Sequence, residues 1–289
     1  MPDLNGKTAF ITGATRGIGL AIGKALAAEG ANIVVIGKTT EPHPKLPGTI
    51  FTAAQEIEAA GGQALPIACD IRSEDRVQEA VDQTVERFGG IDFVINNASA
   101  IFPRSTLDTP IKRWDLMHQV NARGTFLVTQ RCLPHLLKSD NPHILAMSPP
   151  LDMREKWFRP HVAYTSAKFG MSMCILGWAR EFRGQIAANA LWPRTAVATA
   201  AIANVLMGEE AFVACRKPEI LADAVVRIVQ KDAKSFTGNF IIDDTFLASE
   251  GVTDFDQYSV QPGVPLIPDF FIPDDIPIPE GVVLSDIQL

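Results

Sequence analysis

The chain has 289 residues, 47% of them hydrophobic and 20% charged, which is long enough and balanced enough for one large α/β domain with a substantial core. Its formal net charge of −7 argues against a nucleic-acid partner, because proteins that bind the phosphate backbone usually present a basic face. The four cysteines lie far apart without a C-x-x-C pair, which excludes a zinc knuckle and a disulfide framework. The sequence has neither a signal-peptide core nor a run of about 18 apolar residues, so we expect a cytoplasmic protein without a membrane span.

Apolar runs bounded by turn residues alternate with stretches of helical period along the chain. This alternation predicts an α/β fold, a doubly wound parallel sheet of about seven strands with helices on both faces. Strands are expected near residues 7–12, 32–36, 64–69, 91–96, 143–148, 186–192 and 239–243, and helices near 16–29, 49–60, 73–88, 111–138, 161–183 and 218–230. We expect one domain over residues 1–261 and a Pro-rich extended arm over 262–289, which crosses its own domain or a neighbouring subunit, or else is a free tail.

The first expected strand leads into a glycine-rich turn, Thr12-Gly13-Ala14-Thr15-Arg16-Gly17-Ile18-Gly19, and then into an Ala/Leu-rich helix. Gly13 suits a positive φ, Gly17 leaves no Cβ between backbone and ligand, and Gly19 lets the helix lie close to the sheet. The first N–H groups of that helix have no intrahelical partner, so an anion such as a pyrophosphate is the natural occupant. The turn therefore predicts a dinucleotide site in a Rossmann-type sheet, although glycines also mark turns that bind nothing.

The end of the second expected strand indicates which dinucleotide binds. NAD-binding folds commonly place an acidic side chain there, on the 2′-hydroxyl of the adenosine ribose, whereas this chain has Gly37-Lys38. Lys38 and Arg16 are available to pair with a 2′-phosphate, and no carboxylate would repel it, so we expect NADP(H) in preference to NAD(H). Alternatively, Lys38 is an ordinary loop lysine that faces solvent and contacts no phosphate. The Pro-rich loop at residues 41–48 either folds over the adenosine or faces water.

A second motif, Tyr164-Thr165-Ser166-Ala167-Lys168, lies in the helix expected over residues 161–183. Residues four apart share one helix face, so the Lys168 ammonium can stabilise the Tyr164 phenolate and lower the high pKa of the phenol. A tyrosine and a lysine at this spacing also occur by chance on helix surfaces. Downstream of the glycine-rich turn and of Asn96-Asn97-Ala98, the pair indicates proton transfer at a bound dinucleotide.

Together these motifs resemble the short-chain dehydrogenase/reductase family, over about residues 5–245. The resemblance implies an oxidoreductase in which Tyr164 donates a proton while Lys168 tunes the phenol and binds the nicotinamide ribose. It also implies that Ser148 holds the substrate carbonyl and that Asn121 orders a water. The dinucleotide site implied by the family comprises Thr12, Gly13, Thr15, Arg16, Gly17, Ile18, Gly19, Lys38, Asp70, Asn97, Ala98, Tyr164, Lys168, Pro193 and Thr195, with Thr199 as a second candidate for the last position. No metal is required.

Three features depart from the family pattern. Ser99 stands in place of a glycine, Pro149-Pro150 follow Ser148, and Arg194 replaces another glycine. We expect Arg194 either to contact a phosphate or to point into solvent. Ser148 is alternatively an ordinary hydroxyl at the end of a strand, without a role in catalysis. Asp70, which the family would place on the adenine edge, has the alternative of helping to start the next helix. These departures leave a second function open, a nucleotide-dependent binding or regulatory protein without turnover.

Two features of the expected helices bear on the site and on assembly. Asn121 is a poor mid-helix residue and lies close to Gly124, which predicts a local kink within the helix over 111–138. The helices over 111–138 and 161–183 carry apolar residues beyond what one sheet face needs. The family pairs these helices across twofold axes, so a homodimer or homotetramer is expected.

The expected mouth of the site is rich in apolar side chains. They lie between Ser148 and Tyr164 and after the sixth strand: Leu151, Met153, Trp157, Phe158, Trp192, Ile202, Val205, Leu206 and Met207. We expect a medium or long apolar aldehyde, ketone or alcohol of terpenoid, fatty or steroid type, rather than a sugar or a small hydroxy acid. Cations at the entrance are expected to admit the anionic end of an acyl thioester: Arg154, Lys156 and Arg159. The alternative is that the aromatic residues are core and the mouth is polar.

Overall fold

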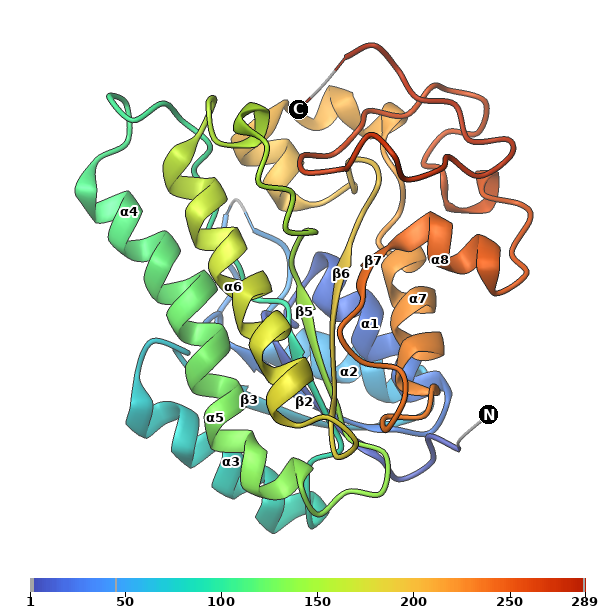
Figure 1. Cartoon of the computed structure of the whole chain (residues 1–289). Coiled ribbons are helices and arrows are strands. Elements are labelled where there is room, and N and C mark those ends of the chain that lie inside the picture. The colour runs from blue at the N-terminus through green and yellow to red at the C-terminus, as the bar shows by residue number, and fades with distance from the viewer. Residues whose placement is uncertain (1–2, 45, 288) are drawn as a thin grey trace.

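A parallel sheet of seven strands runs through the centre of the molecule in the order β3-β2-β1-β4-β5-β6-β7 (Figure 1). The computed structural model describes residues 3–44, 46–287 and 289, so Lys45 of the Pro-rich loop lies outside the described residues. The strands are β1 (Thr8–Thr12), β2 (Asn32–Gly37), β3 (Gln63–Ala68), β4 (Phe93–Asn96), β5 (His143–Met147), β6 (Ala187–Trp192) and β7 (Phe240–Ile242). Each lies close to its predicted position and each neighbouring pair is parallel, so the predicted fold class is confirmed.

Helices cover both faces of the sheet, because successive strand residues point to opposite sides and both sides are apolar. On one face, α1 (Gly17–Ala28), α2 (Ile50–Ala59) and α7 (Glu219–Val229) share a core with Ile11 and Ile33 of the sheet. On the other face, α3 (Glu74–Phe88), α5 (Gly124–Leu136) and α6 (Val162–Glu181) share a core with Phe10 and Val34. In the part of the chain that the structure describes, none of the helices combines the length and the apolar character that crossing a bilayer would take.

The stretch expected as one helix over 111–138 consists of three segments. These are α4 (Ile111–Met117), a π-helical segment (His118–Arg123) and α5. A π-helical segment, a common cause of a bend, lies where the kink was predicted, and Asn121 lies inside it. The Asn121 side chain accepts a hydrogen bond from the Ala100 N–H at 2.8 Å and donates to the Ala100 carbonyl at 3.0 Å. These two bonds fix the π-helical segment to the loop that follows β4.

The chain after β5 contains further elements that periodicity did not predict. The helix α8 (Asp243–Ser249) follows β7 directly. Short helical segments without a repeating apolar pattern occur at Glu155–Trp157, Glu209–Ala214 and Asp256–Tyr258, whereas the π-helical segment Ile202–Leu206 holds apolar residues that were expected at the mouth. Segments of one turn give too few residues for a period to be recognised, which explains why the sequence did not reveal them.

The Pro-rich arm lies above β6 and β7 and packs on its own domain (Figure 1, red). Its described residues, 262–287 and 289, contain isolated bridges and no helix. The Asp269 N–H donates to the Arg194 carbonyl at 2.9 Å, and the Phe271 side chain is fully buried, 6.0 Å from the Tyr164 ring between centroids. A free tail would bury no aromatic ring, so the arm is part of the folded structure.

Arg194 neither contacts a phosphate-binding surface nor exits to solvent, so both expectations for it were wrong. Its side chain is 2% exposed, and its Nε lies 2.7 Å from a carboxylate oxygen of Asp244. Arg216, fully buried, pairs with the same carboxylate at 2.9 Å. Arg194 also donates to the Pro277 carbonyl of the arm at 2.8 Å. Buried charges need partners, so the arginine in place of a glycine becomes an anchor for the arm.

Candidate active site

Two adjacent cavities open at the carboxyl ends of the strands, the edge at which open parallel sheets bind ligands. The larger is a cleft of about 650 Å³ that runs from the glycine-rich turn to the loop after β4. The smaller has a volume of about 180 Å³ and lies between β6, α6 and the arm. Asn97, Ser99 and Thr199 are among the residues that line both, so one extended ligand could occupy the cleft and reach into the smaller cavity.

The glycine-rich turn has the geometry that a phosphate requires. Gly13 has a φ of 66°, and a Cβ on Gly19 would lie 2.5 Å from the Gly13 carbonyl oxygen, so neither position tolerates a side chain. Because α1 begins at Gly17, its first N–H groups lie beside the cleft, where the positive end of the helix dipole favours an anion. Nine of the residues expected to bind the dinucleotide line the cleft: Gly13, Thr15, Arg16, Gly17, Ile18, Lys38, Asp70, Asn97 and Ala98.

Hydrogen bonds of Thr12 and Asn97 hold the glycine-rich turn against the segment that follows β4. The buried Thr12 Oγ1 accepts from the N–H groups of Asn97 and Ala98, both at 3.0 Å. The Asn97 Nδ2 donates to the carbonyls of Thr12 at 2.9 Å and Gly13 at 3.1 Å. These bonds tie the carboxyl ends of β1 and β4 together, so the substitution of Ser99 for glycine leaves the turn intact.

The outer end of the cleft carries the charges expected to select the dinucleotide. The Lys38 side chain is 61% exposed, and its Nζ lies 3.7 Å from an Asp70 carboxylate oxygen. Arg72 donates to both Asp70 oxygens, and these hydrogen bonds hold the pKa of Asp70 at about 2. The Arg16 Nε donates to the Pro47 carbonyl at 2.7 Å, which holds the Pro-rich loop beside the cleft. The Asp70 carboxylate is therefore engaged by cations of the protein itself.

Tyr164 and Lys168 both line the smaller cavity, on one face of α6. The Lys168 Nζ donates to the Met147 carbonyl at 2.6 Å and lies 4.9 Å from the Trp192 ring centroid. Burial lowers the pKa of Lys168 to about 7. Burial also raises the pKa of Tyr164, with the negative charge of Asp269 adding to the effect. Both residues lie on one face of α6 as predicted, but the Tyr164 pKa moves upward, because burial disfavours the charged phenolate.

Ser148 is the third residue expected at the reaction centre. Its side chain is fully buried, and its Oγ has no hydrogen-bond partner among the described residues. The chain turns just before it, where the Ser148 N–H donates to the Ala146 carbonyl at 2.9 Å, and Ser148 is not among the residues that line the smaller cavity. Its role in holding the substrate oxygen therefore stays a prediction.

Some residues of the segment after β6 line the smaller cavity and others do not. Pro193 and Thr199 line the smaller cavity, and Thr199 also lines the cleft. Thr195 is fully buried, and its Oγ1 has no hydrogen-bond partner among residues 3–44, 46–287 and 289. Of the two threonines considered for this position, Thr199 is the one that lines the cavities.

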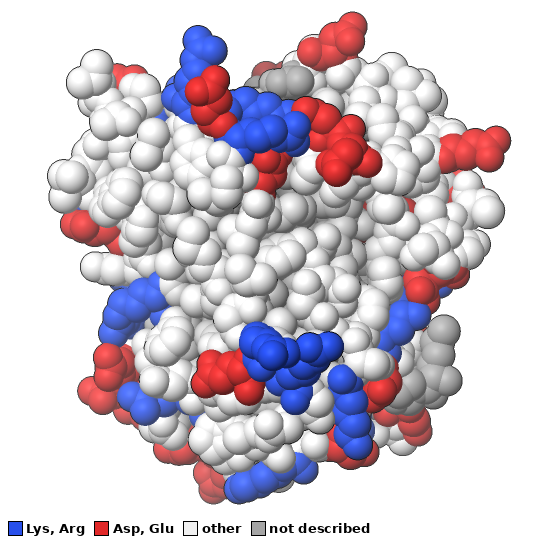
Figure 2. All heavy atoms as spheres, viewed as in Figure 1, with Lys and Arg blue, Asp and Glu red and all other residues white. Residues whose placement is uncertain are grey.

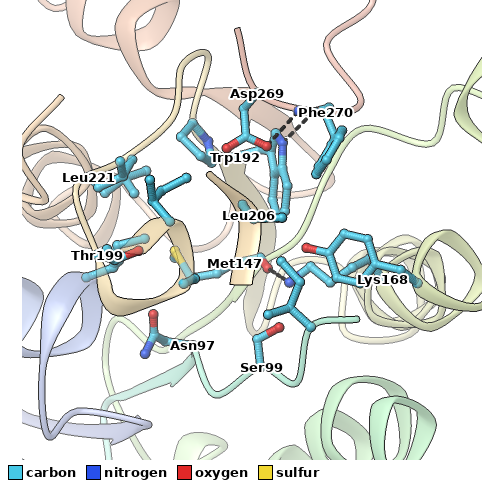
Figure 3. A pocket seen from close by; sticks show the side chains of 17 residues that line it. Asn97, Ser99, Met147, Lys168, Trp192, Thr199, Leu206, Leu221, Asp269 and Phe270 are labelled. Carbon is cyan, nitrogen blue, oxygen red and sulfur yellow. Dashed lines mark hydrogen bonds between the residues drawn. The ribbon is translucent and has the colours of Figure 1, made fainter. Parts of the chain in front are cut away.

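The arm supplies two residues of the cavity wall that the sequence analysis missed. Asp269 and Phe270 lie beside Trp192, whose Nε1 donates to the Phe270 carbonyl at 2.7 Å (Figure 3). The signal available in the sequence was an acidic residue inside the apolar run Leu266-Ile267-Pro268-Asp269-Phe270-Phe271. A lone acid among apolar residues is unusual in a surface tail, and here it marks a wall of the cavity.

The nine apolar residues expected at the mouth lie in different places. Four line one of the cavities: Trp192, Ile202, Val205 and Leu206. Three pack into an aromatic cluster around Phe271: Leu151, Trp157 and Phe158. Met153 is exposed, and Met207 packs in a separate cluster. Of the three cations expected at the entrance, Arg154 and Lys156 each pair with Asp274 of the arm at 2.6 Å, so the arm engages part of the set that was assigned to the substrate.

Comparison with known proteins adds family-level information. A family model described as short chain dehydrogenase matches residues 7–210. Proteins called Hydroxysteroid dehydrogenase-like protein 2 are 58% identical in Danio rerio and in Rattus norvegicus, over 94% and 93% of this chain. The chain spans 66% of the first and 51% of the second, so about a third to a half of each relative has no counterpart here. A solved short chain dehydrogenase from Mycobacterium thermoresistibile is 53% identical over 98% of this chain and all of its own, with a TM-score of 0.90.

Proposed function

Because this chain belongs to the short-chain dehydrogenase family, we propose that it is an NADP(H)-dependent oxidoreductase acting on the carbonyl or alcohol carbon of an apolar substrate. The observation that carries the proposal is the placement of Tyr164 and Lys168 in a small apolar cavity that adjoins a dinucleotide-sized cleft. That cleft begins at a glycine-rich turn whose helix N-terminus suits a pyrophosphate. The residues present therefore fit a nicotinamide dinucleotide.

The protein's own residues position the substrate and move the proton. A bound NADPH would supply the hydride that adds to the carbonyl carbon. Tyr164 donates its phenolic proton to the oxygen of that carbonyl as negative charge develops there, and takes a proton back in the oxidative direction. Lys168 lies on the same helix face, where its ammonium form stabilises the resulting phenolate. Asn121, held against Ala100, is proposed to order a water that returns the proton from bulk solvent.

The preference for NADP(H) is supported by packing as well as by charge. A Cβ on Gly37 would lie 2.6 Å from the Thr15 Cγ2, so this position has no room for the carboxylate that recognises a ribose 2′-hydroxyl. Lys38 and Arg16 line the same part of the cleft and are the cations proposed to meet a 2′-phosphate. Solved proteins of this fold hold either dinucleotide: a metagenomic short-chain oxidoreductase has NADP and a carveol dehydrogenase from Mycobacterium avium has NAD. At 24% and 22% identity they share the fold alone, so the choice rests on Gly37 and Lys38.

The proposed substrate is apolar around its reacting carbon. The smaller cavity is lined mainly by side chains such as Met147, Trp192, Leu206 and Phe270. Its volume of about 180 Å³ compares with the roughly 150 Å³ of an apolar cavity that holds benzene. A substrate of terpenoid, fatty or steroid type would therefore place a ring-sized or short branched portion beside Tyr164 and extend the remainder outward.

A panel of carbonyl compounds tests the proposal. NADPH oxidation is followed with aldehydes of increasing chain length, cyclic ketones and a polyol-derived aldehyde, each with NADH in parallel. We expect kcat/KM to rise with apolar surface near the carbonyl, by about 25 cal/mol for each Å² buried. A flat or falling series, or better turnover of the polyol-derived compound, would contradict the apolar substrate; no turnover of any compound would contradict the reductase.

One observation favours a second candidate, a nucleotide-binding regulatory protein without turnover. The Ser148 Oγ is buried without a hydrogen-bond partner among the described residues, and Ser148 is not among the residues that line the cavity with Tyr164. The two candidates differ in the consequence of Tyr164→Phe: a regulator would bind NADPH and carry out its function unchanged. Purified protein that binds NADPH tightly but reduces no member of the panel would support the regulator.

We further propose a cytoplasmic homo-oligomer that uses the outer faces of α5 and α6. Apolar side chains are exposed there, including Phe126 at 48%, Met173 at 53% and Leu176 at 54%. Figure 2 shows that the centre of this face, over α6, is largely free of charged side chains. Exposed apolar patches of this kind mark interfaces. Light scattering at micromolar concentration should give a dimer or tetramer, and Leu176→Glu should shift it toward monomer; a wild-type monomer would contradict the proposal.

A further inference from the structure

Asp269 is an acidic side chain in a cavity that is otherwise mainly apolar. The cavity also contains Tyr164 and Lys168, and Trp192 and Phe270 lie next to Asp269 (Figure 3). Transferring a carboxyl group from water into apolar surroundings is costly unless hydrogen bonds replace those of water. A carboxyl held at such a position therefore requires a partner, and the question is which of its atoms has one.

Among the residues that the structure describes, one oxygen of the Asp269 carboxyl has a hydrogen-bond partner. Its Oδ1 accepts from the Phe270 N–H at 2.7 Å, whereas the described residues give Oδ2 no hydrogen bond. Oδ2 is not sealed in the interior either, because the residue contributes to the cavity wall and is not among the buried groups left without a partner. The backbone on either side is fixed by the bond from the Asp269 N–H to the Arg194 carbonyl and by the bridge between Thr195 and Pro268. A rigid segment thus presents one free carboxyl oxygen to the cavity.

The surroundings of Asp269 favour a neutral polar ligand over a cation. The titratable groups that act on it are Lys168 and Tyr164 in the same cavity, with Asp243 and Cys215 behind the wall. Burial raises the pKa of Asp269 to about 8, a direction that Asp243 reinforces and Lys168 opposes. In its protonated form the carboxyl offers an O–H donor and an acceptor, and in its ionised form it accepts only. A hydroxyl group matches it in either protonation state, because a hydroxyl both donates and accepts.

The position of Asp269 assigns it to the substrate rather than to the dinucleotide. The wall that the cavity shares with the larger cleft contains Asn97, Ser99 and Thr199, and Asp269 lies outside that shared wall. In Figure 3, Asp269 and Asn97 lie on opposite sides of the cavity. A dinucleotide that arrives from the cleft approaches along the Asn97 side, which leaves the Asp269 side to the substrate.

We propose that Asp269 binds a hydroxyl group of the substrate, so that the chain acts on apolar carbonyl or alcohol compounds that carry a second hydroxyl away from the reacting carbon. This inference rests on the proposed oxidoreductase function and narrows its substrate class. The Pro-rich arm is then a specificity element, since it places Asp269 and Phe270 in the wall of the site. Such a substrate has two polar ends, one at Tyr164 and one at Asp269, with apolar surface between them.

The test compares matched substrates in matched variants. Straight-chain aldehydes are paired with hydroxyaldehydes of the same heavy-atom count, with the hydroxyl at each position along the chain, and kcat/KM is measured with NADPH. The variants are Asp269→Leu, which removes the polar group, and Asp269→Asn, which retains a donor and an acceptor. Asp275→Asn, an exposed acid of the same arm, is the matched control. Thermal unfolding of each variant checks that the arm remains folded.

For at least one hydroxyl position, wild-type protein should prefer the hydroxyaldehyde by about tenfold, the effect of one buried hydrogen bond. Asp269→Leu should reduce that ratio to about one, Asp269→Asn should keep part of it, and Asp275→Asn all of it. An unchanged ratio in Asp269→Leu would overturn the inference. A higher KM for NADPH with every aldehyde would also overturn it, because the carboxyl would then belong to the cofactor site.

A binding measurement separates failure of this inference from failure of the proposed function. Calorimetry compares a diol with a simple alcohol of equal size, each added to the protein saturated with NADP⁺. If no aldehyde is turned over, a preference for the diol that disappears in Asp269→Leu still supports the hydroxyl site. Equal binding of both alcohols to wild type would contradict the site whether or not the protein is an enzyme.

Discussion

The two sides of the candidate site are built in different ways. On the cleft side, a continuous turn from Thr12 to Gly19 and its brace from Asn97 position backbone N–H groups, and no buried charge is involved. On the cavity side, residues far apart in the chain meet: Arg194 pairs with Asp244, and the arm closes over both. A site made of backbone geometry is tied to one ligand chemistry, whereas a wall made of side chains from a separate segment can change without disturbing the fold. The general reaction is therefore assigned to the first side and the choice of substrate to the second.

The largest effect is expected from breaking the buried charges that anchor the arm. Asp244→Asn leaves the buried Arg194 and Arg216 without their shared carboxylate, which should reduce the free energy of unfolding by about 3–5 kcal/mol. Equilibrium unfolding in urea measures the change. Glu56→Gln, which removes an exposed partner of Lys24, is the control and should cost less than about 1 kcal/mol. An Asp244→Asn protein as stable as that control would show that the arm does not depend on these ion pairs.

The two sides should also respond to pH with opposite signs. Burial, reinforced by the charge of Asp244, raises the pKa of Asp243 to about 7, so the folded state retains a proton that the unfolded state loses above about pH 4. Stability from this group therefore falls as pH rises from about 4 to 7. Hydrogen bonds from Arg72 lower the pKa of Asp70 to about 2, so its contribution is present above about pH 4 and is lost as pH falls toward 2.

Unfolding free energies at a series of pH values separate the two groups. Relative to wild type, Asp243→Asn should gain on the order of 2–4 kcal/mol between pH 4 and pH 7, because the amide keeps the acceptor for the Arg194 N–H without titrating. Asp70→Asn should lose stability relative to wild type above pH 4 and approach it toward pH 2. Parallel curves for wild type and Asp243→Asn would contradict the raised pKa.

Catalysis should depend on Tyr164, which lines the smaller cavity. Tyr164→Phe keeps the ring that packs near Phe271 and removes the proposed proton donor, so kcat should fall by at least about 10²-fold. NADPH binding, measured by fluorescence titration, should change little because the larger cleft is untouched. A variant that keeps most of its rate would place the proton donor elsewhere.

The smallest effect is expected at the outer end of the cleft. Lys38→Ala should weaken NADPH binding by about 1–3 kcal/mol, the range for a charge-assisted contact, and leave NADH binding unchanged. The loss of NADPH binding free energy should lie near the lower end of that range, because Lys38 is exposed and its Nζ already lies 3.7 Å from Asp70. Titration of both dinucleotides measures the difference. Equal loss for NADPH and NADH would remove the argument for a 2′-phosphate contact.

Local sequence patterns predicted the glycine-rich turn and the Tyr164–Lys168 pair. Contacts between residues far apart in the chain could not be predicted from the sequence. The turn from Thr12 to Gly19 and the Tyr164–Lys168 pair each lie within a few residues, so spacing alone fixes their geometry. Arg194 meets Asp244 across 50 positions and receives the arm from still farther along the chain, which no periodicity reveals. Ser148 remains a prediction for a different reason, because a strand end followed by two prolines does not by itself determine which side the last hydroxyl faces.

Transfer of a label from the dinucleotide to the substrate tests the central claim most directly. NADPH carrying deuterium at the hydride position of C4 is incubated with the protein and the best aldehyde of the panel, and the alcohol formed is analysed by mass spectrometry. An oxidoreductase that uses Tyr164 as its acid should place one deuterium on the carbinol carbon, and the amount of labelled alcohol should fall by about 10²-fold in Tyr164→Phe. Tight binding of NADPH without labelled alcohol would contradict the account and identify the chain as a nucleotide-binding protein that performs no hydride transfer on these compounds.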